Sequence, residues 1–168
     1  MTDTTCLALA QALGDALTLR GAQVSTAESC TGGGIGQAIT AVAGSSAWFE
    51  AGYITYSNAQ KTRQLDVPAA LFEHLGAVSR EVVEAMARGA QRHSGARYAV
   101  AVSGVAGPGG GSREKPVGTV WLAIADGPQL YSEKHLFAGD RAAVRRQTVE
   151  AALRGLLRVM VEENDTPG

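Results

Sequence analysis

The stretch Tyr98–Ser103, which reads YAVAVS, is almost entirely apolar and is the strongest indicator of the fold class. A continuous apolar run of this length predicts a strand that is buried on both faces, as in a sheet covered by helices. Two short β-prone segments precede it, QVSTA at Gln23–Ala27 and YITY at Tyr53–Tyr56. Because helical patterns separate these three segments, they indicate neighbouring parallel strands.

The helical segments are marked by their caps and stops. Gly21 ends an amphipathic first helix, and a second helix is expected to end at Gly44. Further helices are expected over NAQKTRQL with Asn58 as its cap, over Pro68–His74, over REVVEAMARGAQRHS between Ser79 and Gly95, and after Asp140.

The last two strands are expected to form a hairpin. Thr119–Ala125 and Leu130–Phe137 flank the turn-rich connection Asp126–Gln129, so at least one strand must run antiparallel. We therefore expect a three-layer α/β/α sandwich around a mixed, mostly parallel five-stranded sheet, folded as one domain over residues 1–168.

Composition narrows the classes of partner. The 168 residues include 15 Lys and Arg against 16 Asp and Glu, so the chain has no basic surplus for a nucleic-acid partner. Asp15 interrupts the apolar pattern of the N-terminal segment, so neither a signal peptide nor a membrane partner is expected. Cys6 and Cys30 stand in no metal-ligand spacing, and we expect two free thiols in the cytoplasm.

Polar residues follow three of the expected strands. Ser29-Cys30-Thr31 comes after the first strand, Tyr56-Ser57-Asn58 with Lys61 after the second, and Ser103 with the loop GPGGGS after the third. Ligands of open α/β sheets bind beyond the carboxyl ends of parallel strands. The three groups are therefore expected to meet on one rim.

The glycine run in AESCTGGGIGQAI, residues 27–39, carries neither nucleotide-binding motif. G-x-G-x-x-G fails because Gln37 or Ile39 occupies the sixth place, and no Gly-Lys-Ser/Thr of a Walker loop follows. Taken alone, the run indicates a tight strand-to-helix turn whose free N–H groups favour an anion.

Two candidate nucleophiles lie within this turn, and the sequence does not decide between them. Ser29 has no histidine in a recognisable relation and no G-x-S-x-G around it, but a desolvated lysine can serve as base, and Lys61 is placed to reach the rim. Cys30 is the rival, because helix N-termini favour thiolates. The S-x-x-K at Ser112–Lys115 lies between glycines and Pro116 and is interpreted as accidental.

Five ordered segments together resemble one family. They are AESCTGG (27–33), GSSAWFEAGYITYSNAQK (44–61), GAVSREVV (76–83), SGVAGPGGGSREKPVGTVW (103–121) and GDRAAVRRQ (139–147). The sequence resembles the nicotinamide mononucleotide amidohydrolase family, which is the C-terminal domain of the competence/damage-inducible protein CinA. Because the large N-terminal domain of full CinA proteins is missing from the sequence, it resembles the stand-alone form.

The resemblance implies an α/β/α sandwich, a homodimer, and hydrolysis of nicotinamide mononucleotide to nicotinate mononucleotide and ammonia without a metal or organic cofactor. It implies Ser29 as nucleophile and Lys61 as base, acting directly or through the Tyr56 hydroxyl. Substrate contacts are expected at Cys30, Thr31, Gly32, Gly33, Asn58, Ser103, Gly104, Gly107, Gly109 and Gly110.

Departures from the family pattern and two alternative functions also belong to this interpretation. Gly34, Gly36 and Asp66 depart from the family pattern, which bears on packing and loop flexibility more than on the chemistry. A catalytically silent nucleotide-binding module of the CinA type is the alternative. A structural role in DNA uptake or damage response rests only on the historical name of the family.

Overall fold

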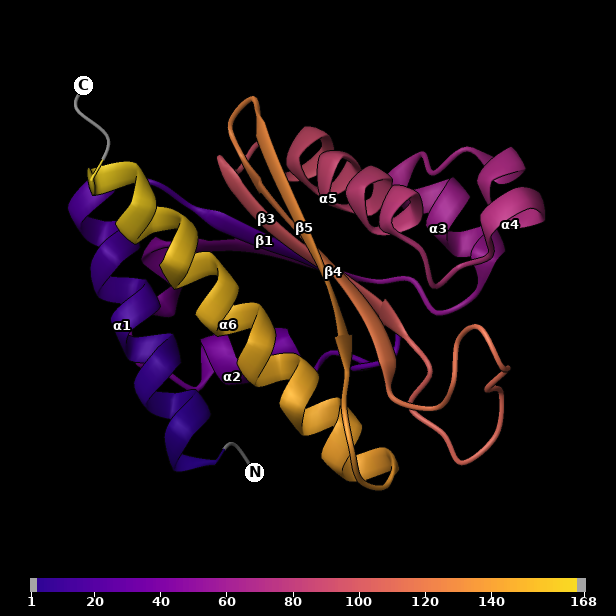
Figure 1. Ribbon diagram of the computed structural model, residues 1–168. Coiled ribbons are helices and arrows are strands. Elements are labelled where there is room, and N and C mark those ends of the chain that lie inside the picture. Colours follow the sequence, from indigo (N-terminus) through magenta and orange to yellow (C-terminus); the bar gives the residue numbers. More distant parts are fainter. Residues whose placement is uncertain (1–2, 166–168) are drawn as a thin grey trace.

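The computed structural model describes residues 3–165, in which a five-stranded sheet separates two layers of helices (Figure 1). The strand order is β2-β1-β3-β4-β5. The strands are β1 (Val24–Glu28), β2 (Phe49–Ile54), β3 (Tyr98–Gly104), β4 (Thr119–Asp126) and β5 (Gln129–Leu136).

The sheet is mixed, as expected. β1 pairs in parallel with both β2 and β3, whereas β4 is antiparallel to β3 and to β5. Only β4 therefore runs against the other four strands, and the sheet is mostly parallel in strand direction. The residues of β3 from Tyr98 to Ser103 are all buried, which confirms the interpretation of YAVAVS as a central strand covered on both faces.

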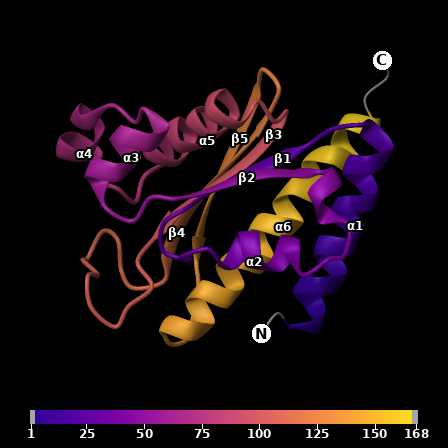
Figure 2. The ribbon, with the colours of Figure 1, turned by 180° about the vertical axis from the view of Figure 1, so that it is seen from behind.

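One face of the sheet is covered by the helices α1 (Thr4–Arg20), α2 (Gly34–Thr40) and α6 (Arg141–Asp165), seen at the lower left of the sheet in Figure 1 and at its lower right in Figure 2. α1 begins where the Asp3 carboxylate accepts a hydrogen bond of 2.7 Å from the Cys6 N–H and ends at Gly21, which has a positive φ of 59°. The apolar faces of the helices bury a core with Leu13, Val100 and Leu153 at its centre.

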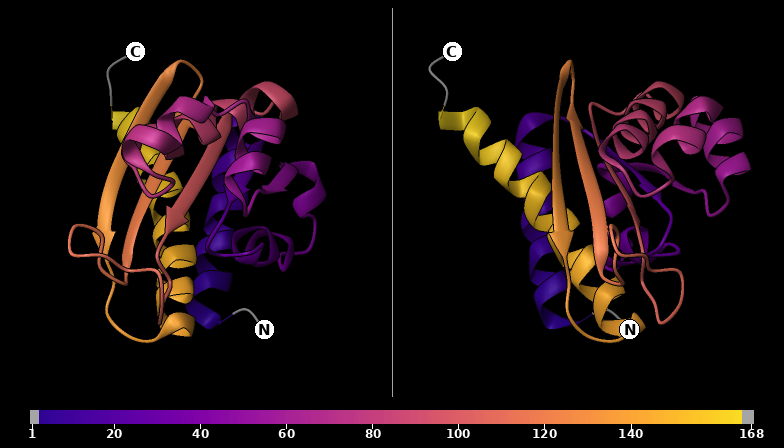
Figure 3. Two further views of the ribbon diagram at one scale, coloured as in Figure 1. Left: turned by 90° about the vertical axis from the view of Figure 1, so that its right-hand side faces the viewer. Right: turned by 45° about the vertical axis from the view of Figure 1, so that its right-hand side comes forward.

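The other face carries α3 (Asn58–Leu65), α4 (Ala69–Leu75) and α5 (Arg80–Ser94), and the layers are separated clearly in Figure 3. α5 passes so close to α3 that a Cβ on Gly89 would lie 2.0 Å from the Leu65 carbonyl oxygen. Only glycine permits this approach, which packs the helix that carries Lys61 against α5, the helix that covers this face of the sheet.

The structure differs from the sequence-based expectations at three boundaries. The second helix ends at Thr40 rather than Gly44, and a short 3-10 turn, η1 (Ser45–Ala47), follows it. β2 begins at Phe49 and ends before Tyr56, because Phe49 pairs with Val24 at the start of β1. The cap of α3 is Ser57 rather than Asn58, since the Ser57 side chain accepts the hydrogen bond from Gln60 N.

Candidate active site

The carboxyl ends of β1, β2 and β3 surround a cavity of about 280 Å³. The three groups of polar residues that the sequence placed on one rim therefore do meet. The lining consists of Ser29, Cys30, Tyr56, Asn58, Lys61, Ala77, Val78, Ser103, Gly104, Val105, Ala106, Gly107, Gly109, Gly110 and Arg141.

The central contact of the cavity joins Ser29 to Lys61. Ser29 follows β1 directly, and Lys61 reaches it from the first turn of α3, where its Nζ donates to Ser29 Oγ at 3.0 Å and to the Tyr56 carbonyl oxygen at 2.8 Å. The Lys61 side chain is only 1% exposed, and this burial lowers its pKa from 10.5 to about 8. A lysine in this state can take up and return a proton near neutral pH.

The two polar groups of Tyr56 have different partners from those that a proton relay between Ser29 and Lys61 would require. Its main-chain carbonyl binds Lys61, whereas its hydroxyl is bonded to Arg141 Nη2 at 3.2 Å. Arg141 also donates to the Gly107 carbonyl oxygen at 2.8 Å, so one guanidinium connects the ring of Tyr56 with the glycine-rich loop. The phenol, which is 62% exposed, thus belongs to the mouth of the cavity.

Cys30 lines the cavity beside Ser29 but is electrostatically unsuited to nucleophilic attack. Its side chain is buried, and this burial raises the pKa of the thiol to about 11. The reactive form of cysteine is the thiolate, which is scarce at neutral pH when the pKa is so high. Of the two nucleophiles that the sequence left open, the environment favours Ser29.

A carboxylate that the sequence analysis missed organises the turn after Ser29. Glu28 is 2% exposed and accepts hydrogen bonds from Ile35 N at 2.8 Å, Gly36 N at 3.0 Å and Thr31 Oγ1 at 2.6 Å. These bonds satisfy free N–H groups at the start of α2. The sequence signal that could have indicated this role is the position of Glu28 directly before Ser29, in a buried strand.

The glycines of the turn have a conformational role. Gly32 and Gly33 have φ values of 59° and 105°, which side-chain-bearing residues rarely adopt, and Gly32 N donates to the Ser29 carbonyl oxygen at 3.1 Å. This agrees with the interpretation of the run as a strand-to-helix turn. Thr31, Gly32 and Gly33 were expected to contact substrate, but the structure does not place them in the cavity lining, because the turn carries them behind Ser29.

The other expected contacts, Cys30, Asn58, Ser103, Gly104, Gly107, Gly109 and Gly110, do line the cavity. Among the additional lining residues, Arg141 brings a positive charge from the start of α6. In the sequence, Arg141 lies in the motif GDRAAVRRQ, which follows the last strand. The end of that strand was not expected to contribute residues to the site.

Several residues considered for chemistry lie outside the cavity. Ser112 and Lys115 form a turn closed by hydrogen bonds of 2.9 and 3.0 Å between them, not a helix, so this S-x-x-K has no catalytic geometry. His93 and His135 pair with Asp66 and Glu133 on the surface. Both cysteines are free.

Within residues 3–165, no helix is long and apolar enough to cross a membrane. The same part holds no group of three or more His, Cys, Asp or Glu side chains that could bind a metal ion.

Replacing Glu28 by glutamine is expected to lower the free energy of unfolding by about 2 kcal/mol, because an amide offers one acceptor to donors that now share two charged oxygens. Chemical denaturation measures the change. Glu50→Gln removes the same charge from an exposed position of β2 and is expected to change stability by less than about 0.5 kcal/mol. Equal effects in the two variants would show that the Glu28 bonds contribute nothing specific.

Comparison with known proteins gives the same family along nearly the whole chain. Residues 7–160 match the family described as CinA C-terminal domain. The chain is 71% identical to the nicotinamide-nucleotide amidohydrolase PncC of Pseudomonas putida, over 92% of this chain and 96% of that protein. It is 51% identical to the protein of the same name from Escherichia coli K12, over 93% and 95%.

Solved structures agree with the sequence relatives. The crystal structure of the competence/damage inducible protein CihA from Agrobacterium tumefaciens superimposes with a TM-score of 0.92 at 42% identity, covering 94% of this chain and 97% of that one. The CinA superfamily protein from Klebsiella pneumoniae 700603 gives a TM-score of 0.90 at 36% identity, with coverage of 94% and 98%. The match in sequence and fold places this chain in the CinA C-terminal domain family.

Proposed function

We propose that this protein is a nicotinamide-nucleotide amidohydrolase that converts nicotinamide mononucleotide and water to nicotinate mononucleotide and ammonia. One observation carries the proposal: the buried Lys61 ammonium lies 3.0 Å from Ser29 Oγ inside a cavity at the strand ends. The relatives named for this activity share 71% and 51% of their aligned residues with the chain.

The first half of the reaction makes an ester on Ser29. Neutral Lys61 takes the proton of Ser29 Oγ while the oxygen bonds to the carboxamide carbon, so that the carbonyl oxygen becomes negatively charged. Lys61, now an ammonium, returns the proton to the amide nitrogen as the C–N bond breaks and ammonia leaves. The nicotinoyl group is then an ester of Ser29.

The second half returns the enzyme to its starting state. Neutral Lys61 removes a proton from a water molecule, which attacks the ester carbonyl. The C–Oγ bond breaks, Ser29 recovers its proton from Lys61, and the acid product releases its remaining proton to solvent and departs as the carboxylate. Lys61 thus acts as base and then as acid in each half.

The negative oxygen formed in both halves needs a hydrogen-bond donor. The N–H of Gly32 is engaged by the Ser29 carbonyl, so we propose the N–H of Cys30, the residue after the nucleophile. In other enzymes one such donor contributes about 3 kcal/mol to stabilising the transition state. Burial of Cys30 keeps its thiol neutral, so it does not repel the developing charge.

The nucleotide part of the substrate calls for a positive group and close main-chain approach. Arg141 supplies the charge, and Gly107, Gly109 and Gly110 let the substrate approach the loop without side chains in the way. We propose that these residues hold the ribose phosphate, with Asn58 and Ser103 as further polar contacts. Thr31, Gly32 and Gly33 act through the shape of the turn.

Three further statements belong to the proposal. The chain acts as one amidohydrolase domain over residues 1–168, functions as a homodimer, and works in the cytoplasm without a nucleic-acid partner. The two free cysteines support the cytoplasm as the compartment. The formal net charge of −1 supports the absence of a nucleic-acid partner.

The proposal is tested by incubating the purified protein with nicotinamide mononucleotide and following ammonia by a coupled assay and nicotinate mononucleotide by chromatography. The two products are expected in equal amounts. Ammonia without the acid product, or no turnover, would contradict the proposal, and tight binding without turnover would favour the catalytically silent module. Free nicotinamide serves as a control for the requirement of the nucleotide part.

The dependence of kcat/KM on pH is expected to follow Lys61. The base must be neutral, and burial lowers its pKa to about 8, so kcat/KM rises with pH and levels off above about 8.5. Near pH 7 roughly a tenth of the molecules hold neutral lysine. A profile that is flat between pH 6.5 and 9 would argue against Lys61 as the base.

A further inference from the structure

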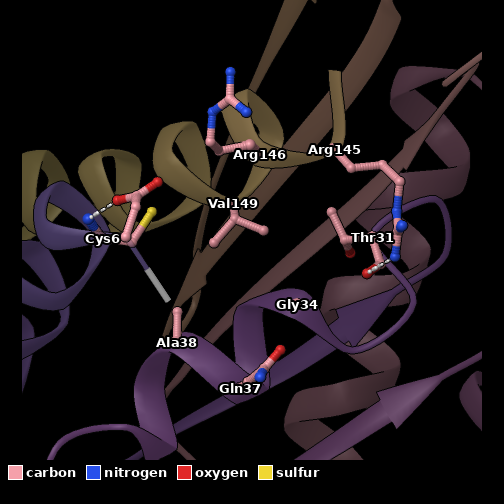
Figure 4. A pocket seen from close by; sticks show the side chains of 9 residues that line it. Cys6, Thr31, Gly34, Gln37, Ala38, Arg145, Arg146 and Val149 are labelled. Carbon is pink, nitrogen blue, oxygen red and sulfur yellow. Dashed lines mark hydrogen bonds between the residues drawn. The ribbon is translucent and has the colours of Figure 1, made fainter. Parts of the chain in front are cut away.

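A second cavity, of about 230 Å³, lies behind the turn that follows Ser29, between α1, α2 and α6 (Figure 4). It shares no lining residue with the cavity that contains Ser29 and Lys61. Thr31 belongs to its wall, so the turn has the substrate cavity in front of it and this second cavity behind it.

The lining of the second cavity combines an apolar floor with a positive edge. Val149 and Ala38 are buried and apolar, and burial raises the pKa of the neighbouring Cys6 thiol to about 11, which keeps it uncharged. Arg145 and Arg146 of α6 provide two guanidinium groups. The carboxylate of Asp3 is the opposing charge in the lining, and it is already bonded to the Cys6 N–H. Such a lining suits a small organic anion with a short apolar body.

Arg145 connects this cavity with the nucleophile. Figure 4 shows its side chain leaving α6 and reaching the Thr31 turn, where Nη2 donates to the Thr31 carbonyl oxygen and Nε to the Cys30 carbonyl oxygen, both at 3.2 Å. A Cβ on Gly32 would lie 3.3 Å from the same guanidinium, so the contact is close along the turn. These two carbonyls belong to the residues directly after Ser29.

We propose that the second cavity is an effector site for small carboxylates, and that an occupying carboxylate inhibits the enzyme by drawing Arg145 away from the turn. Charge-assisted hydrogen bonds to a carboxylate are stronger than those to neutral carbonyls, so the guanidinium exchanges its partners. The main chain at Cys30, with its proposed oxyanion donor, then loses its support from α6. The inhibitory part rests on the proposed function, whereas binding does not.

Binding is tested by adding sodium butyrate to the ¹⁵N-labelled protein and recording amide shifts, with sodium chloride at equal ionic strength and butyramide as the uncharged isostere. Saturable shifts are expected at Thr31, Gly34 and Gln37 with butyrate only. Arg146→Gln is expected to weaken the affinity about fivefold or more. Arg158→Gln, on the same helix but outside the lining and bonded to Glu133, leaves it unchanged.

Three results would overturn the site: equal shifts with butyramide, shifts confined to the Ser103–Gly110 region, or an affinity that Arg146→Gln does not alter. Each would place the ligand elsewhere or remove the role of charge. Because these readings need no substrate, they stand even if the protein shows no turnover, which would contradict the proposed function alone.

Inhibition is tested by steady-state kinetics with nicotinamide mononucleotide. Saturating butyrate is expected to lower kcat about fivefold with little change in KM, within the usual range of coupling between sites. Arg146→Gln keeps the basal kcat and loses the inhibition. Arg145→Gln has a lower basal kcat that butyrate does not lower further, and addition of methylguanidinium is expected to restore part of it.

Two kinetic outcomes would overturn the coupling. A rise in KM alone means that butyrate competes for the substrate cavity. Saturable binding behind the turn without any change in kcat means that Arg145 does not transmit the occupancy of the site.

Discussion

Ser29→Ala is expected to lower kcat with nicotinamide mononucleotide by roughly 10⁴-fold or more, because the variant cannot form the ester on which the reaction depends. The buried Lys61 remains and keeps its bond to the Tyr56 carbonyl oxygen, but its side-chain acceptor is gone. Binding of the nucleotide is expected to persist, since Arg141 and the glycine-rich loop are untouched. Ammonia release measures the rate, and calorimetry with the unreacted substrate measures binding.

Two comparisons make this result specific to the nucleophile. Cys30→Ala is expected to release ammonia at a rate far above that of Ser29→Ala, because burial holds the thiol in its protonated form. Ser132→Ala, an exposed change on β5, controls for loss of a hydroxyl as such. Substantial turnover by Ser29→Ala, or loss of turnover in Cys30→Ala alone, would replace the serine mechanism with a thiol mechanism.

Lys61→Met is expected to lower kcat by about 10²- to 10⁴-fold, the contribution of a positioned base, and to remove the rise of kcat/KM with pH. Methionine fills a similar volume in the buried site and has no titrating group. Residual activity is then expected to be independent of pH between 6.5 and 9. Arg63→Gln, which removes an exposed positive charge from the same helix, is the matched control.

Lys61→Met also allows the titration of Lys61 to be followed through the free energy of unfolding. Its pKa is 10.5 in the unfolded chain and about 8 when folded, so between these values the folded protein binds fewer protons and becomes more stable as the pH rises. Between pH 7 and 10, the unfolding free energy of the wild type relative to Lys61→Met is expected to increase by about 2 kcal/mol.

This difference between two proteins is needed because the cysteines act in the opposite direction. Burial raises the pKa values of Cys6 and Cys30 to about 11, so their contribution to stability falls as the pH rises through the range in which unfolded thiols ionise. Both proteins carry these thiols, so the contribution of Cys6 cancels, and that of Cys30 enters the difference only through its Coulombic interaction with Lys61. Denaturation curves at several pH values that differ by a constant amount would show that Lys61 keeps an ordinary pKa.

The arrangement of the sheet and the neighbourhood of the site follow from local patterns in the sequence. YAVAVS is apolar on both faces, so only a covered central strand buries it, and the short Asp126–Gln129 connection requires the antiparallel hairpin that β4 and β5 form. Because parallel neighbours end at the same edge, Ser29, Lys61 and Ser103 could be placed on one rim from their positions after strands. The boundaries of β2 were missed because its residues alternate in burial at the edge of the sheet and include Glu50 and Gly52.

The protonation states and the partners of the reactive groups depend on contacts between segments that are distant in sequence. Burial by segments distant in sequence lowers the pKa of Lys61 and keeps the Cys30 thiol protonated. The choice between Ser29 and Cys30 as nucleophile could therefore not be made from the local sequence pattern. The contacts of Arg141 with Tyr56 and Gly107, and of Arg145 with Cys30 and Thr31, join residues 34 to 115 positions apart. Local sequence fixes hydrogen-bonded turns and strands, whereas burial and long-range contacts exist only once those elements pack together.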